Sequence, residues 1–194
     1  MDIETTGLEP EEHEITVLGC GDGYEVHTIT GDEKEILGVL VDLLRRAGFV
    51  VGYNIAKFDG PFIVKRARVH SVDCGGVSVK TIDLYRHVRA NFSLTRYTLT
   101  HAAAGLAGVS CGEDITGAEA ARLSQCGELE KVEEHCARDV VRTYYLYRAL
   151  VERRVLEEVE LTPWLGRALK EVRAESRVRV KKHDVRVAVV RCSV

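Results

Sequence analysis

The chain has 194 residues, of which 45% are hydrophobic and 29% charged, and its formal net charge is −3. This length suits one well-buried domain with an appendage, and the composition excludes a disordered chain. No apolar run reaches the length of a membrane span and no signal peptide opens the chain, so we expect an intracellular, cytoplasmic protein without a membrane partner. The six cysteines include no Cys-x-x-Cys pair, which argues against a zinc site or a disulfide framework.

The charge is unevenly distributed along the chain. Residues 1–44 carry twelve acids and one lysine, whereas residues 161–194 carry nine Lys or Arg and three acids. An acidic end suits cations, and a basic end suits phosphate groups or an acidic partner.

Alternating and continuous apolar runs predict the strands. In chain order, we expect them over residues 1–5, 14–18, 24–29, 49–53 and 77–84. Asp22 and Gly23 supply the turn between the second and third strands. Because a helix precedes strand 49–53, this strand should run parallel to the first and be buried on both faces. Residues 177–180 and 185–190 predict a basic β-hairpin near the end of the chain.

Apolar positions at helical spacing predict the helices. They are expected over residues 33–47, from 58 or 59 to about 67, 98–106, 116–126, 129–156 and 164–169. Capping boxes at Thr30–Glu33 and Thr116–Glu119 open two of them, and Thr162-Pro163 precedes the last. Strands and helices mixed in this order favour an α/β fold with a central mixed sheet flanked by helices.

Four acids stand where a purely structural pattern would not need them. In a strand over residues 1–5, Asp2 and Glu4 point the same way, and hard oxygen ligands at one edge of a sheet favour Mg²⁺ or Mn²⁺. Asp59 opens a helix, and Asp139 interrupts the buried stripe of the longest helix. Each acid also has a plainer interpretation, as a solvated strand end, a helix cap, or the surface partner of a neighbouring arginine.

Together these segments resemble the DEDD superfamily of 3′-to-5′ exonucleases, and most closely the exonuclease domain of family B DNA polymerases. The matching segments, in chain order, are Asp2–Gly7, Gly52–Asp59 with Lys65–Ala67, Asp83–Arg86 with Tyr97–Leu99, and His135–Val140. Each motif is weak by itself. Three of them in the right order and at plausible separations make the resemblance specific.

The resemblance implies a ribonuclease H-like domain over residues 1–160, with residues 161–194 as a C-terminal helix and hairpin. It also implies two divalent metals, Mg²⁺ or Mn²⁺, held by Asp2, Glu4, Asp59 and Asp139. Phosphodiester hydrolysis independently favours this arrangement, because two cations about 3.5–4 Å apart activate water and stabilise the leaving oxygen. The expected function is therefore a metal-dependent 3′-to-5′ exonuclease acting on single-stranded DNA or RNA ends.

His135 departs from the family pattern. In the subclass that this chain otherwise resembles, a tyrosine stands four residues before the last aspartate, and His135 occupies that place. The histidine subclass keeps its histidine five residues before the aspartate, a difference of about 100° around a helix. We expect His135 to act near the attacking water, as a base or as a hydrogen-bonding group that orients it, with a structural role as the alternative.

The substrate contacts are expected from the same motifs. Asn54 and Phe58 match positions that contact the 3′-terminal nucleotide by hydrogen bonding and by stacking, although Phe58 is equally compatible with a core position. The backbone of Thr5 is placed to meet the terminal base, and Tyr97 is a further candidate contact. The basic hairpin suits backbone phosphates, or a second copy or a polymerase as partner.

Two other functions remain open from the sequence. The first is a catalytically decayed exonuclease that binds nucleic acid or a polymerase, for which the histidine at position 135 leaves room. The second is an endonuclease of the ribonuclease H or resolvase type, which would share the fold and the metals. Related domains begin their first strand several residues before the aspartate, so either neighbouring strands pin Asp2 or the natural start lies upstream.

Overall fold

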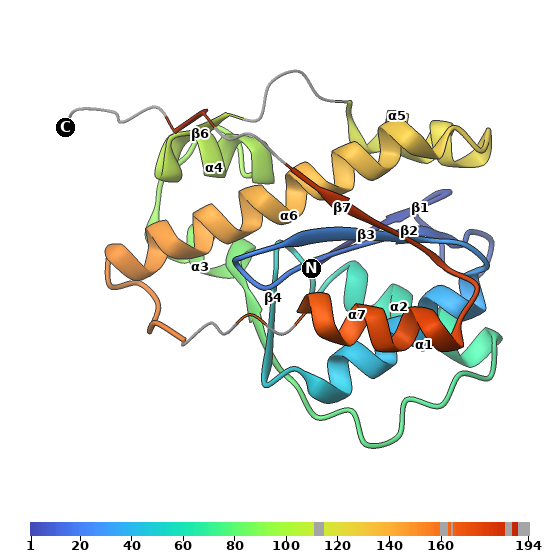
Figure 1. Cartoon of the computed structure of the whole chain (residues 1–194). Coiled ribbons are helices and arrows are strands. Elements are labelled where there is room, and N and C mark those ends of the chain that lie inside the picture. Colours follow the sequence, from blue (N-terminus) through green and yellow to red (C-terminus); the bar gives the residue numbers. More distant parts are fainter. Residues whose placement is uncertain (111–114, 160–162, 164, 185–187, 190–194) are drawn as a thin grey trace.

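The computed structural model describes residues 1–194 except 111–114, 160–162, 164, 185–187 and 190–194 (Figure 1). Its strands are β1 (Asp2–Thr5), β2 (Ile15–Gly21), β3 (Val26–Thr30), β4 (Phe49–Gly52), β5 (Lys80–Asp83), β6 (Val109–Ser110), β7 (Arg179–His183) and β8 (Ala188–Val189). Its helices are α1 (Glu33–Arg46), α2 (Asp59–Val69), α3 (Leu84–Asn91), α4 (Leu99–Ala107), α5 (Gly117–Gln125), α6 (Leu129–Glu152) and α7 (Leu165–Glu175). The predicted α/β class is confirmed.

The largest sheet has the order β1-β2-β3-β7, and all of its neighbouring strands are antiparallel. Asp22 stabilises the β2–β3 turn, because its side chain accepts hydrogen bonds from the backbone N–H groups of Tyr24 and Glu25, both at 3.0 Å. The hairpin predicted around Asp22 and Gly23 is thereby confirmed. β4 and β5 form a separate parallel pair.

Two helical layers enclose the main sheet (Figure 1). The apolar face of α1 packs with side chains of α2, α7 and the sheet, including Ile3, in one core cluster. On the opposite face, Cys136 of α6 joins Val17 and residues of α5 in a second cluster. Ile3 and Cys136 therefore mark the two sides of the sheet at β1.

Helix capping agrees with the sequence at one predicted box and differs at the other. Thr116 caps α5 by accepting from the backbone N–H of Glu119. At α1 the cap is Asp32, whose side chain accepts from Lys34 and Glu35, because Thr30 still belongs to β3. The helix α3 is missing from the sequence-based assignment, since the predicted strand over 77–84 continues as a helix after Asp83.

The prediction that strand 49–53 is buried on both faces is wrong. Phe49, Val50 and Val51 are only partly buried, because a cavity runs along β4. Among the described residues, β4 forms its hydrogen-bonded ladder with β5. A hydrogen bond from the Met1 amino group to the carbonyl oxygen of Val51, 2.8 Å long, joins β4 to the start of β1.

The predicted C-terminal hairpin is also wrong for the described residues. β7 pairs with the open edge of β3, and β8 pairs with β6. Side chains explain the choice for β7: Lys182 pairs with Glu25, and Arg179 lies 2.7 Å from an oxygen of the buried Glu133. Leu165, Ala168 and Leu169 of α7 belong to the main core cluster, and α7 extends beyond the predicted 164–169. The Thr162 cap lies outside the described residues.

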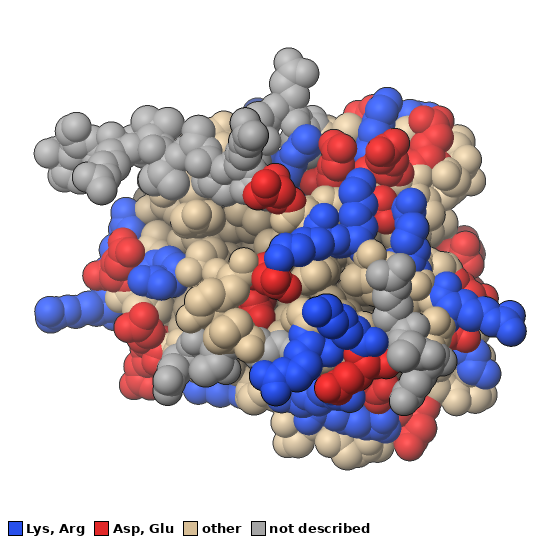
Figure 2. All heavy atoms as spheres, in the orientation of Figure 1, with Lys and Arg blue, Asp and Glu red and all other residues tan. Residues whose placement is uncertain are grey.

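Lys and Arg side chains over β7 and α7 are interspersed with Asp and Glu on the same face (Figure 2). Within the described residues, none of the helices combines the length and the apolar character needed to cross a membrane.

Candidate active site

Asp2 and Glu4 lie on the face of β1 that is turned toward α6. Strand alternation sends Ile3 into the core on the opposite side, as predicted. The Glu4 residue is 8% exposed, and Asp2 is half-buried opposite Gly19 of β2. The two carboxylates therefore stand side by side at the first strand, with little water around Glu4.

Asp59 is the first residue of α2 and is 5% exposed. Its carboxylate accepts a hydrogen bond from the backbone N–H of Ile3, which ties α2 to the strand between the two β1 acids. The N-cap residue of α2 is Phe58, so Asp59 stands one position inside the helix, where its carboxylate also accepts from its own backbone N–H. The plainer interpretation of Asp59 as a helix cap therefore does not hold.

The loop before Asp59 is held by Asp83, the last residue of β5. Its carboxylate accepts from the backbone N–H of Asn54 at 2.9 Å and of Ala56 at 3.2 Å, and it also caps α3. Asn54 has φ 62°, in the left-handed region, where asparagine is one of the more tolerant residues. Asp83 thus positions the turn that delivers Asp59 to the site.

The long helix α6 contributes His135, Cys136 and Asp139. The Nε2 atom of His135 lies 3.7 Å from a Glu4 oxygen and 3.9 Å from an Asp139 oxygen, so the imidazole stands between these two carboxylates. Cys136 Sγ lies 3.6 Å from an oxygen of Asp2. Because residues four apart share a helix face, the spacing of His135 and Asp139 brings both to β1.

Burial and mutual repulsion make the ionised form of the carboxylates in this cluster unfavourable. Burial raises the pKa of Asp2 well above its usual value, and the charges of Asp139 and Asp59 raise it further. Burial also raises the pKa of Asp59 to about 6. The pKa of the Cys136 thiol is raised by burial and by the surrounding acids. These directions place Asp2 and Asp139 within electrostatic reach of each other.

One oxygen of Asp139 is bound by an arginine. Arg142 Nη1 lies 2.6 Å from Asp139 Oδ1, and the Arg142 side chain is 2% exposed. The sequence suggests such a partner at the surface, whereas the structure has it in the interior. The other oxygen, Oδ2, is the one nearer to His135. Arg142 therefore fixes the orientation of the Asp139 carboxylate.

The donor set fits a hard divalent cation. Asp2, Glu4 and Cys136 each offer a ligand atom, and these atoms lie within 4.8 Å of one another. Carboxylate oxygens suit Mg²⁺ and Mn²⁺, and a cation among them would relieve the repulsion from Asp139 and Asp59 that adds to the raised pKa of Asp2. Four acids and an imidazole from β1, α2 and α6 thus form a site suited to metal-dependent chemistry.

Gly19 allows α6 to approach the sheet at this point. A Cβ atom on Gly19 would lie 2.6 Å from Cys136 Sγ and 2.9 Å from a methyl carbon of Val140. Gly19 stands opposite Asp2 in the β1–β2 ladder. Its lack of a side chain therefore allows α6 to lie close to β1.

The predicted substrate contacts are placed in different surroundings. Thr5 is buried, and its hydroxyl donates to the carbonyl of Gly7 at 2.6 Å. Phe58 is partly buried, with its ring 5.6 Å from that of Phe62, against the core cluster. Tyr97 packs in another cluster, where its hydroxyl donates to the Phe92 carbonyl. Among the predicted contacts, Asn54 and Phe58 lie on the loop that ends at Asp59.

Sequence reasoning assigned no role to Gly19, Asp83 or Cys136 and missed the interior position of Arg142. A glycine inside an apolar strand is a signal of close backbone approach, and Cys136 lies three residues before Asp139, which places the two on neighbouring parts of a helix face. No local pattern indicates that Asp83 binds the loop at 54–56, because that contact joins segments about 30 residues apart.

A model of the RNase_H superfamily matches residues 1–151. The chain belongs to the ribonuclease H superfamily. Members of this superfamily are mostly nucleases and usually use divalent metals. All four acids and His135 fall within the matched part of the chain.

Two relatives are similar over most of the chain. An uncharacterized protein of Methanocaldococcus jannaschii is 31% identical over 182 residues, covering 81% of this chain and 97% of that protein. A DNA polymerase of Archaeoglobus fulgidus is 28% identical over 163 residues, covering 74% of this chain and 21% of the polymerase. The resemblance to the polymerase family inferred from the motifs is confirmed, and the chain corresponds to a minor part of that polymerase's length.

Proposed function

We propose that this protein is a metal-dependent 3′-to-5′ exonuclease that hydrolyses phosphodiester bonds at single-stranded nucleic-acid ends. The observation that carries the proposal is the convergence of Asp2, Glu4, Asp59 and Asp139 from three elements into one cluster, in which Glu4 and Asp59 are buried and Asp2 and Asp139 partly buried. Burial raises the pKa values of Asp2 and Asp59, and the charges of Asp139 and Asp59 raise that of Asp2 further, which supports a site that holds a cation over a purely structural role.

In this proposal the four carboxylates hold two divalent cations, Mg²⁺ or Mn²⁺. When bound, the cations supply Lewis acidity to both sides of the scissile bond. The chain's own contribution is to fix the ligands. The Ile3 N–H orients Asp59, Arg142 orients Asp139, and Asp83 holds the preceding loop. Such preorganisation matters because a misplaced ligand costs rate even when the metal binds.

His135 is proposed to orient the attacking water or to accept its proton. The imidazole is 7% exposed and its Nε2 atom faces oxygens of Glu4 and Asp139. This position supports a role at the reacting atoms over a purely structural one. Asn54 and Phe58, on the loop before Asp59, are proposed to hold the terminal nucleotide, with Thr5 and Tyr97 as further candidate contacts.

An end-labelled substrate assay tests the proposal. Single-stranded DNA and RNA oligonucleotides carrying a 5′ label are incubated with the protein and Mg²⁺ or Mn²⁺. A ladder that shortens from the 3′ end supports the proposal, and its absence from the Asp2→Ala/Glu4→Ala variant assigns it to the cluster. Internal cuts would identify an endonuclease instead, and retained binding without any product would identify a decayed binding module.

A further inference from the structure

Residues 84–112 contain no Asp or Glu, although the chain as a whole has 30 of them. This stretch includes α3, the loop at 92–98 and α4, and it carries three arginines, Arg86, Arg89 and Arg96. The pair formed by α3 and α4 lies at one end of α6, and α5 lies at the other end (Figure 1). The segment at one end of α6 therefore presents arginines without acids of its own.

The arginines of this stretch are open to solvent. Arg89 and Arg96 are exposed, and neither forms an ion pair with a carboxylate of the described residues. The Arg86 side chain is 66% exposed, with its Nε atom 3.8 Å from an oxygen of Asp83. By contrast, both arginines at the end of α1 form ion pairs with nearby acids. The positive charge of α3 and of the loop after it is consequently available to an anionic partner.

This line of arginines begins beside the loop that carries Asp59 into the site. Asp83 joins the two, because its carboxylate accepts from two backbone N–H groups of that loop and also faces Arg86. Lys57 is exposed on the same loop. Arg89 follows Arg86 at a spacing of three residues, so both lie on one face of α3, about 4.5 Å apart along its axis. Cationic side chains thus lead from the loop along α3.

Tyr97 holds Arg89 in place. The guanidinium carbon of Arg89 lies 4.4 Å from the centre of the Tyr97 ring, which is a cation–π contact. The Tyr97 hydroxyl donates to the Phe92 carbonyl at 2.9 Å, and the Tyr97 carbonyl accepts from the Tyr53 hydroxyl at 2.8 Å. Since Tyr53 immediately precedes Asn54, the support of Arg89 is tied to the loop before α2. An arginine fixed in this way loses little side-chain freedom when it binds an anion.

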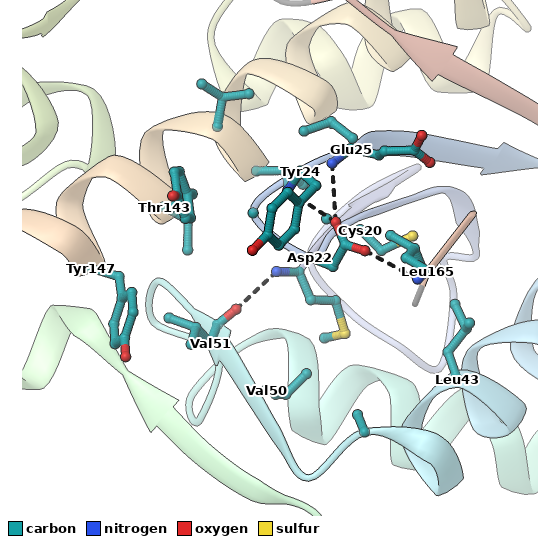
Figure 3. Close-up of a pocket in the computed structure, with 18 of the residues that line it drawn as sticks. Cys20, Asp22, Tyr24, Glu25, Leu43, Val50, Val51, Thr143, Tyr147 and Leu165 are labelled. Carbon is teal, nitrogen blue, oxygen red and sulfur yellow. Dashed lines mark hydrogen bonds between the residues drawn. The ribbon is translucent and has the colours of Figure 1, made fainter. Parts of the chain in front are cut away.

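This set of cationic side chains, which we call the arginine track, consists of Lys57, Arg86, Arg89 and Arg96. The track shares no described residue with the cavity along β4, whose walls include Leu43, Val50 and Thr143 (Figure 3). Clustered carboxylates repel a nucleic acid until cations neutralise them, whereas arginines attract phosphate and bind it through two parallel hydrogen bonds. The track therefore suits the phosphates of a strand whose end lies at the acid cluster.

We propose that the arginine track binds the phosphodiester backbone of a single-stranded nucleic acid upstream of its 3′-terminal nucleotide. The proposal rests on the proposed function, because the acid cluster defines where the strand ends. The strand passes the loop before α2 and continues along α3, where Arg86 and Arg89 contact successive phosphates and Arg96 contacts a further one. Phosphate contacts position a strand without reading its bases, so DNA and RNA should both bind.

Binding is measured by fluorescence anisotropy in EDTA, which prevents metal-dependent hydrolysis. The probes are oligothymidylate and oligouridylate, labelled at the 5′ end and about 12 nucleotides long. Each phosphate contact adds about −0.7 to the slope of log K against log salt for a single strand. Arg89→Gln/Arg96→Gln should therefore bind at least about 10-fold more weakly at about 50 mM salt, with a slope shallower by about 1.4. Arg89→Lys/Arg96→Lys keeps the charge and should restore most of the slope.

The matched control is Arg45→Gln/Arg46→Gln, which removes the same charge from α1 and should leave the affinity and the slope nearly unchanged. Melting curves establish that each variant is folded. Absence of saturable binding to the wild-type protein would overturn the proposal, and so would a folded Arg89→Gln/Arg96→Gln protein that binds like wild type. Equal affinity for polyglutamate of the same length would overturn the assignment to nucleic acid.

The same proteins separate this proposal from the proposed function. A ladder of products in Mg²⁺ or Mn²⁺, together with unchanged binding by the Arg89→Gln/Arg96→Gln variant, would overturn the track and leave the exonuclease. Binding that depends on the track, without any hydrolysis after metal is added, would support the track and count against the exonuclease.

Discussion

At the scale of single residues, the site depends on carboxylates that are unfavourable neighbours. Asp59 lies at the start of α2 with a backbone N–H as its partner, and burial raises its pKa. Burial also raises the pKa of Asp2, and the charges of Asp139 and Asp59 raise it further. Without a cation, these groups favour protonation in the folded state, which links the stability of the protein to pH.

This link predicts a loss of stability with rising pH in the metal-free protein. The Asp59 pKa of about 6 lies above the ordinary aspartate value of 3.8, so the contribution of Asp59 to stability is fully present below pH 3.8 and is lost as pH rises through 6. The difference corresponds to on the order of 3 kcal/mol at most. In EDTA, Asp59→Asn should therefore be more stable than wild type at pH 7.5, and this advantage should vanish near pH 3.5. Urea unfolding at the two pH values measures it, and an equal advantage at both would contradict the assignment.

His135 offers a second test at this scale. If the imidazole acts on the water, His135→Ala should lower kcat by about 100-fold or more at saturating metal and leave KM for the oligonucleotide nearly unchanged. Steady-state kinetics on a labelled single strand separates the two constants. A melting curve of the variant shows whether the fold is intact. Full turnover by a folded His135→Ala protein would remove the residue from the reaction.

At the scale of elements, the close packing of α6 on the sheet brings His135 and Asp139 to β1. Gly19 makes this packing possible, because a Cβ atom there would meet Cys136 and Val140. The antiparallel β1–β2 ladder places Gly19 opposite Asp2. A displacement of α6 at this point would therefore change the distances between its side chains and the β1 acids.

Gly19→Ala should consequently destabilise the protein by about 1–3 kcal/mol and reduce nuclease activity. Gly38→Ala is the matched control, since Gly38 lies in α1 with open space around its Cβ position. That change should stabilise α1 by about 0.5–1 kcal/mol, because alanine is the better helix former. Urea unfolding of both variants gives the comparison. Similar effects in the two proteins would mean that α6 does not depend on Gly19.

For the whole molecule, metal binding should connect the site to global stability. The proposed ligands come from β1, α2 and α6, so a cation bound to all of them would stabilise their arrangement relative to the unfolded chain. We expect millimolar Mn²⁺ or Mg²⁺ to raise the melting temperature, by an amount equivalent to about 2.7 kcal/mol when the metal is at 100 times its Kd. The rise in melting temperature should be larger at pH 8 than at pH 5. At the lower pH, protons compete with the metal for carboxylates whose pKa values are raised.

Differential scanning fluorimetry with a metal titration at both pH values checks this expectation. The Asp2→Asn/Glu4→Gln protein serves as control, since it loses ligand charge with little change of shape. A melting temperature that does not move with either metal would count against a metal site at this cluster.

Much of this protein follows from local sequence pattern. Strand alternation at Asp2, Ile3 and Glu4 and the helical spacing of His135 and Asp139 depend on residues a few positions apart. The α/β class, the β2–β3 hairpin and the cap at Thr116 are local in the same sense. Local geometry is set by backbone periodicity and nearby hydrogen bonds, so the sequence alone was sufficient for them.

Tertiary structure decided which distant groups meet. The pairing of β7 with β3, the hold of Asp83 on the loop at 54–56, the inward turn of Arg142 and the hydrogen bond from Tyr53 to Tyr97 each join segments far apart in the chain. Such contacts depend on which edges and faces remain open after the core has packed, and no short window of sequence contains that information. The acids could therefore be named from the sequence, while their burial and the placement of the arginine track required the folded chain.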